Sequence, residues 1–306
     1  MPPRYVKSRI LKPVQAFLNA GGSQYLVSLL GIGSAVAWSI ASIYADVTKP
    51  GPHDPSWENY SKISARWFVF NTGLMLFLAL LEGPAWGVKG GAKHAKFDLF
   101  PLFSWQVPAF QQILFFWPAA FFLGHQVWKG DTNYLNVPAH GVASLFGQQL
   151  RELVLFDSDA MMVGHHVVTM FLSAYIWWGM QGWFDPITGS CTWPEMVALN
   201  AMSVAALEAG GMGVCVWTMF ESGRAFFWIM STSHALCLGA GWYSIWLAPH
   251  VKFFYVTFVL SVPLIHGRQS YMLKEVKRGS PTGGFENHRF AEEVAAEKGS
   301  KIKKAA

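Results

Sequence analysis

Long apolar runs, separated by short polar gaps, constrain the fold of this chain most strongly. Runs such as LVSLLGIGSAVAWSIASIY and FYVTFVLSVPLIHG contain no charged residue. About 20 apolar residues are needed for a helix to cross the hydrocarbon core of a bilayer. Helices and closed barrels alone satisfy their backbone hydrogen bonds there, and barrel strands would read as alternating segments of roughly ten residues. The runs therefore predict an all-α, multi-pass transmembrane helical bundle.

Composition supports this class and excludes others. Hydrophobic residues make up 52% of the chain and charged residues 13%, whereas a soluble domain carries about 25% charged residues. The net charge of +5 comes largely from the two ends, so it indicates lipid headgroups or topology and no nucleic-acid partner. The cysteines Cys191, Cys215 and Cys237 show no CxxC spacing, so we expect neither a disulfide framework nor a metal site.

The apolar runs predict about eight spans. Pro108 and Pro118 fall within the third of them and are expected to bend it. The predicted spans cover residues 25–45, 66–86, 106–128, 138–157, 161–182, 196–219, 225–247 and 252–273.

Segment 138–157 is the doubtful span. It contains Gln148, Gln149, Arg151 and Glu152, and charges inside a span are costly unless they face a cavity or a partner. If the segment crosses the membrane, both basic ends of the chain lie on one side, as the positive-inside rule requires. With seven spans the basic ends would be split, so we predict eight.

A histidine pair carries the clearest candidate chemistry. His165 and His166 stand near the start of a span, with Asp159 seven residues before His166, Thr169 three after it and Ser173 four further on. At helical spacing these side chains form one polar stripe, which should face the interior or a cavity. His165 projects about 100° away from His166 around the helix.

Two interpretations of the pair remain open from spacing alone. Histidine can exchange protons near neutral pH, which indicates general acid–base chemistry. Membrane helices also use such polar residues to hold a bundle together. Adjacent histidines lack the i, i+4 spacing of two metal ligands on one helix face. We expect other polar residues within spans to form interhelical hydrogen bonds or to lie at the membrane interfaces: Glu82, Gln111, Gln112, His125, His234 and His266.

The stretch His165-His-Val-Val-Thr-Met-Phe-Leu-Ser-Ala-Tyr175 resembles the TLC-domain family, whose best-known enzymes are ceramide synthases. It is similar to the family pattern HHxxTxxLxxxSY. Weaker similarity extends to residues 61–67 and 198–212, so the resemblance covers about residues 60–273.

The resemblance implies a TLC-type helical barrel around a lipid-accessible cavity. In ceramide synthases the paired histidines carry acyl transfer from acyl-CoA to a long-chain amine, so His165 and His166 would be the catalytic pair. Acyl-CoA would be a substrate, bound phospholipid is expected, and no tightly bound cofactor is implied. Around the pair, the residues expected to bind lipid or substrate are Asp159, Thr169, Ser173, Asn200 and Glu208.

The second half of the ceramide synthase motif departs from the family pattern. A His-Asp pair and a further Asp are normal there, whereas this chain has Asn200, Ala201 and Val204; Glu208 does match an acidic family position. The departure leaves two hypotheses open. One is a lipid-binding TLC-domain membrane protein, a divergent N-acyltransferase if active. The alternative is a non-catalytic accessory subunit of a large membrane complex, built on a degenerate TLC fold and bound to other subunits.

The ends of the chain indicate two different membranes. Residues 1–24 are basic and contain no acidic residue, which resembles a mitochondrial address, and the run 25–45 is too long for a signal peptide and is expected to be a retained span. Residues 274–306 form a polar, basic tail with Lys303 and Lys304 near its end, which resembles the dilysine signal of endoplasmic reticulum proteins. The endoplasmic reticulum and the mitochondrial inner membrane both stay open.

Overall fold

The computed structural model confirms an all-α architecture over the residues it describes. These are residues 22–51, 54–86, 107, 110–155, 160–180, 191–206 and 223–249, with single positions at 255, 259, 263, 267 and 270. No strand occurs among them. The helices are α2 (Gly22–Val47), α3 (Trp57–Trp86), the π-helix η1 (Gln112–Phe116), α6 (Trp117–Trp128), α7 (Asn136–Leu155), α8 (Ala160–Met180), α9 (Trp193–Ala206) and α11 (Gly223–Leu247).

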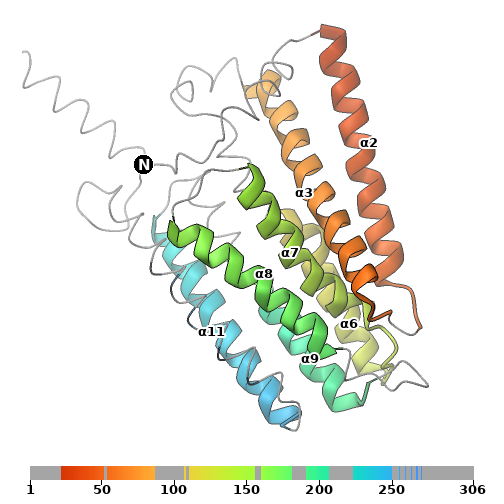
Figure 1. The fold of residues 1–306 in the computed structure, drawn as a ribbon, viewed down its shortest axis with the longest axis vertical. Coiled ribbons are helices and arrows are strands. Elements are labelled where there is room, and N and C mark those ends of the chain that lie inside the picture. The colour runs from red at the N-terminus through yellow and green to blue at the C-terminus, as the bar shows by residue number, and fades with distance from the viewer. Residues whose placement is uncertain are drawn as a thin grey trace, which may run out of the picture.

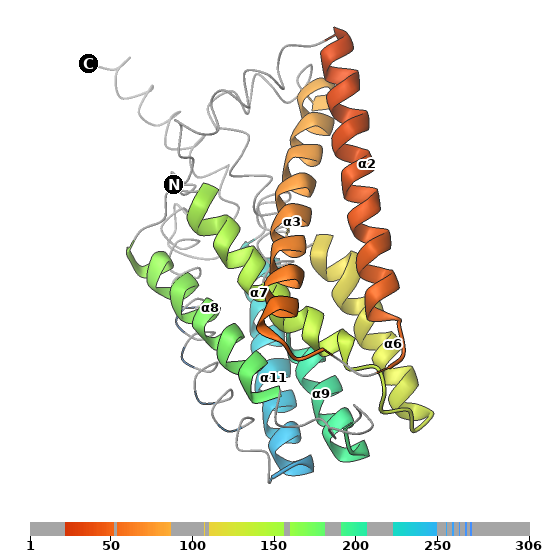
Figure 2. The same cartoon turned by 45° about the vertical axis from the view of Figure 1, so that its right-hand side comes forward.

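Successive helices run up and down in one bundle (Figures 1 and 2). Helix α3 lies between α2 and α7, α8 packs on α7, and α9 packs on α6 and α11. The doubtful segment 138–157 forms a helix, α7. Each predicted span before residue 250 overlaps a described helix, while the last, 252–273, is described only at single helical positions.

Charged side chains of the described residues gather at one end of the bundle. At this end α2, α6, α8 and α11 finish, and α3, α7 and α9 begin (Figure 1). We name it the charged end; its residues are Asp46, Lys49, Asp54, Glu58, Lys62, Arg66, Lys129, Asp131 and Glu195. Of the other charged residues in the described helices, Arg151 and Glu152 lie near the opposite end of α7, Glu82 lies in the last turns of α3 and Arg224 in the first turn of α11. The middle of the bundle therefore presents a surface almost without charge.

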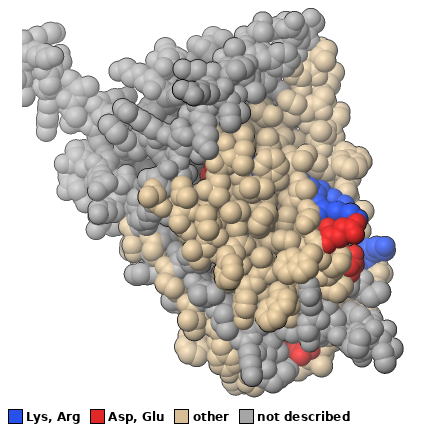
Figure 3. Space-filling view, in the orientation of Figure 1, with Lys and Arg blue, Asp and Glu red and all other residues tan. Residues whose placement is uncertain are grey.

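Large apolar side chains cover that surface instead. Trp178 of α8 is 59% exposed, while its neighbour Trp177 is 1% exposed. The face drawn in Figure 3 shows charged atoms at its right-hand edge, near its lower end and in one small patch beside the grey residues, with none across the broad middle of its described part. Extended exposed apolar patches mark contact with protein or lipid. Other exposed large apolar residues include Leu30, Trp38, Val69, Phe121, Trp128, Val167, Phe171, Trp228, Trp242 and Trp246.

One described helix is both long and apolar enough to cross a membrane by length and composition alone, at Leu26–Val47 of α2. Other described helices, such as α8 and α11, contain histidine, tryptophan, tyrosine and glycine, which lower the mean hydropathy although tryptophan and tyrosine suit membrane interfaces. The crossing of a membrane by these other helices, and with it the count of eight spans, stays a prediction.

The third predicted span departs from regular α-helix just before Pro118. Residues Gln112–Phe116 form a π-helix directly before α6. Pro118 has no N–H group, so the carbonyl of Leu114 loses its normal intrahelical donor. The hydroxyl of Tyr44 in α2 donates to this carbonyl. This hydrogen bond ties α2 to η1. Pro108 lies outside the described residues, and the bend expected in the third span stays a prediction.

Candidate functional site

The polar stripe on α8 faces the bundle interior at two of its positions. His166 and Ser173 are buried, and His165 and Thr169 are partly exposed. The hydroxyl of Thr169 donates to the carbonyl of His165, 2.8 Å away in the same helix. Asp159 lies outside the described residues, so the stripe is described from His165 onward.

Gln149 of α7 orients the imidazole of His166. Nδ1 of His166 hydrogen-bonds to Oε1 of Gln149. An amide oxygen can only accept, so Nδ1 carries the proton and the lone pair remains on Nε2. A base held by a third group in this way is the arrangement that general-base catalysis uses. The ring of His165 lies beside that of His166, with centroids 5.6 Å apart.

Ser173 joins three helices. Its hydroxyl donates to the carbonyl of Val142 in α7 at 2.7 Å and lies 2.9 Å from the hydroxyl of Tyr60 in α3. Such bonds hold helices together in an apolar environment. The role of Ser173 in binding a substrate stays a prediction.

Asn200 of α9 faces α6. A Cβ atom added to Gly124 would lie 3.5 Å from its Nδ2 atom, and its Oδ1 atom is buried with no hydrogen bond to the described residues. Ala201 and Val204 follow it in α9. Glu208, the remaining predicted binding residue, lies outside the described residues.

A chain of polar contacts near the charged end was not foreseen from the sequence. Nη1 of Arg66 lies 3.0 Å from Oδ2 of Asp46, and Nε2 of His140 lies 2.9 Å from the same oxygen. Nε1 of Trp67 donates to Nδ1 of His140 at 3.3 Å. Because an indole N–H can only donate, Nδ1 of His140 is the acceptor and Nε2 donates to Asp46.

This tautomer gives His140 a structural role. Both of its ring nitrogens are engaged by the protein, whereas a general base needs a lone pair directed at its substrate. The contacts connect α2, α3 and α7, from the partly exposed Asp46 to the buried Trp67. The sequence feature that could have indicated these contacts is the position of Asp46, the first acidic residue, directly after the first apolar run.

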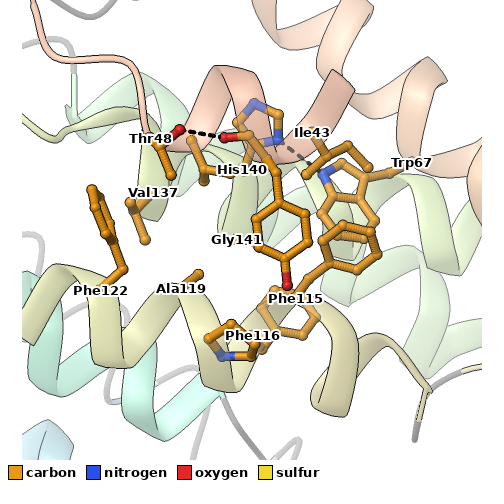
Figure 4. Close-up of a pocket in the computed structure, with 13 residues that line it drawn as sticks. Ile43, Thr48, Trp67, Phe115, Phe116, Ala119, Phe122, Val137, His140 and Gly141 are labelled. Atoms are coloured by element: carbon orange, nitrogen blue, oxygen red, sulfur yellow. Dashed lines mark hydrogen bonds between the residues drawn. The ribbon is translucent and has the colours of Figure 1, made fainter. Parts of the chain in front are cut away.

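A small apolar pocket lies next to these polar contacts, between α2, α3, η1–α6 and α7 (Figure 4). Its volume is about 40 Å³, enough for roughly three water-sized groups. The hydroxyls of Tyr44 and Thr48 are bonded to backbone carbonyls of Leu114 and Tyr44, so the pocket suits an apolar group. It is lined by Ile43, Tyr44, Val47, Thr48, Trp67, Phe115, Phe116, Pro118, Ala119, Phe122, Val137, His140 and Gly141.

Within the described part of the chain, no three His, Cys, Asp or Glu residues are grouped as a metal site would require. Cys191 and Cys237 are buried free thiols. Burial raises the pKa of the Cys191 thiol to about 12, so at neutral pH it is protonated and a poor nucleophile or metal ligand. Cys215 lies outside the described residues.

Comparison with known proteins finds no match to a family model, a curated protein or a solved structure. The TLC-domain resemblance therefore rests on the motif at residues 165–175 and its weaker extensions, and it stays a prediction.

Proposed function

We propose that this chain is an integral membrane protein of the TLC type that binds acyl lipid, with one acyl chain ending in the apolar pocket beside α2. The observation that supports this proposal is an apolar pocket within a bundle whose outer surface is itself apolar. Exposed Trp38 of α2 and Phe121 of α6 belong to the helices that border the pocket. A chain end in a surrounding bilayer would have direct access to it.

The size and lining of the pocket favour a chain end over a whole lipid. About 40 Å³ accepts only a few carbon atoms. The walls include the aromatic rings of Trp67, Phe115 and Phe122, which offer dispersion contacts but no available hydrogen bond. Lipid tails are as apolar as these walls, so van der Waals fit decides binding here.

Filling the pocket tests this proposal. Ala119 lines the pocket, and Ala119→Leu should reduce the lipid that co-purifies with the protein by about tenfold, since each buried methylene contributes about 0.8 kcal/mol at most. Ala41→Leu is the matched control, because Ala41 is exposed on α2. Lipid bound after exhaustive detergent washing is quantified by mass spectrometry. Equal retention by both variants would refute pocket binding.

Acyl transfer at the histidine pair is the second candidate function. The observation in its favour is the hydrogen bond that Nδ1 of His166 donates to Gln149, which leaves the lone pair of His166 on Nε2. Ala201 and Val204 stand where the family carries acidic groups, which counts against ordinary ceramide synthase chemistry. Transfer of a labelled acyl group from acyl-CoA to a long-chain amine is the assay that decides it.

A further inference from the structure

Asn71 of α3 is a buried amide with no hydrogen-bond partner among the described residues. It is 0% exposed, and both its Oδ1 and Nδ2 atoms lack a partner. Amides that join membrane helices normally bond across to a neighbour. Asn71 does not, although α3 is enclosed between α2 and α7.

A second such amide lies at the same level of the bundle. Gln111 is 1% exposed, and its Nε2 atom also lacks a partner among the described residues. The rings of Phe70 and Phe115 pack with centroids 4.8 Å apart. Asn71 directly follows Phe70, and Gln111 precedes Phe115 by one turn, about 5.4 Å. Both amides therefore lie within one turn of a single aromatic contact.

Arg151, a buried residue of α7 with a positively charged side chain, lies near the same level of the bundle. Gly147 touches the α3 backbone at Ser64 and Phe68, where α3 and α7, which both begin at the charged end, cross (Figure 2). Arg151 is one turn beyond Gly147, and Asn71 is three residues beyond Phe68. Arg151 is 0% exposed and pairs with Glu152. Polar side chains of three helical segments thus lie near one level of the bundle, about one turn from Trp67 and Phe115 of the apolar pocket.

We propose that Asn71 and Gln111 form an internal polar site that binds a neutral hydroxyl group. A buried polar group without a partner is strongly unfavourable, and leucine would fill either position without that penalty. Nδ2 of Asn71 and Nε2 of Gln111 donate hydrogen bonds, and Oδ1 of Asn71 accepts one. The bound group must therefore both accept and donate hydrogen bonds. A hydroxyl does so, whether it belongs to an ordered water molecule or to a lipid headgroup. The site goes beyond the proposed chain-end pocket and does not depend on it.

Hydroxyl-radical labelling of the intact protein in nanodiscs tests the site. Met75 is buried one turn beyond Asn71, and Met196 of α9 is equally buried. If the bound hydroxyl is that of water, radicals form from it, and Met75 is oxidised in the native protein while Met196 is not. Asn71→Leu should lower Met75 oxidation about tenfold or more, because the site loses two hydrogen bonds. Gln111→Leu provides the same readout should Asn71→Leu fail to fold.

The outcomes separate the two sources of the hydroxyl. Oxidised Met75 that is protected by Asn71→Leu supports bound water. Unoxidised Met75 together with a native lipid that is lost from Asn71→Leu supports a lipid hydroxyl. If Met75 behaves like Met196 and the variant keeps every lipid of the native protein, the site does not exist. A higher Tm for Asn71→Leu would then be expected, because an unpaired amide would have been removed.

Discussion

Gly147→Ala is expected to lower the free energy of unfolding by about 3 kcal/mol, the upper end of overpacking costs. A Cβ atom at this position would lie 2.5 Å from the carbonyl oxygen of Ser64 and 2.8 Å from the amide nitrogen of Phe68. Both are backbone atoms, which cannot rotate away as a side chain could. The helices α3 and α7 must therefore separate, which opens the central contact of the bundle. Thermal or denaturant unfolding in detergent measures the loss.

Gly141→Ala on the same helix is the matched control. A Cβ atom at Gly141 meets nothing within 4 Å, so this variant should be stabilised by up to about 1 kcal/mol through helix propensity. Comparable stability of the two variants would contradict the close approach of α3 and α7 at Gly147.

If the chain is an acyltransferase, His166→Asn should reduce kcat about 10²- to 10⁴-fold, the usual contribution of a general base. Gln149→Leu should cause a smaller loss, because it removes the acceptor that orients His166 and leaves the imidazole in place. Gln149→Glu keeps an acceptor oxygen and should recover part of the activity. Labelled acyl-CoA and a long-chain amine provide the assay.

His125→Asn is the control for these variants, since His125 is exposed on α6. It should leave turnover unchanged. Native protein that forms no product, and that migrates with other subunits in a large assembly after mild extraction, would favour the accessory-subunit alternative. Full activity of His166→Asn would remove the histidine pair from the reaction.

The positions of the helices could be predicted from the sequence because each long apolar run marks a segment that forms an apolar helix. The doubtful segment 138–157 corresponds closely to α7. Helix α3, however, begins at Trp57, nine residues before the predicted span 66–86. Its first turns carry the exposed pair Glu58–Lys62, so hydropathy could not reveal them.

The contacts between helices could not be predicted. Asp46 and His140 are 94 residues apart, and Trp67 and His140 are 73 apart. Periodicity identifies which side of a helix is buried, but it does not say which other helix covers that side. For the same reason the sequence could not show that His166 donates a hydrogen bond to Gln149.

Spin labelling of neighbouring positions on α8 tests most directly whether the bundle is embedded in lipid. Phe171 is 66% exposed and Leu172 is 6% exposed. Single cysteines at these positions, in a cysteine-free background reconstituted into liposomes, carry a nitroxide label. We expect the label at position 171 to be accessible to oxygen and inaccessible to a water-soluble nickel chelate, and the label at position 172 to be inaccessible to both. Strong nickel accessibility at position 171 would show that this surface faces water and would contradict the proposed membrane protein.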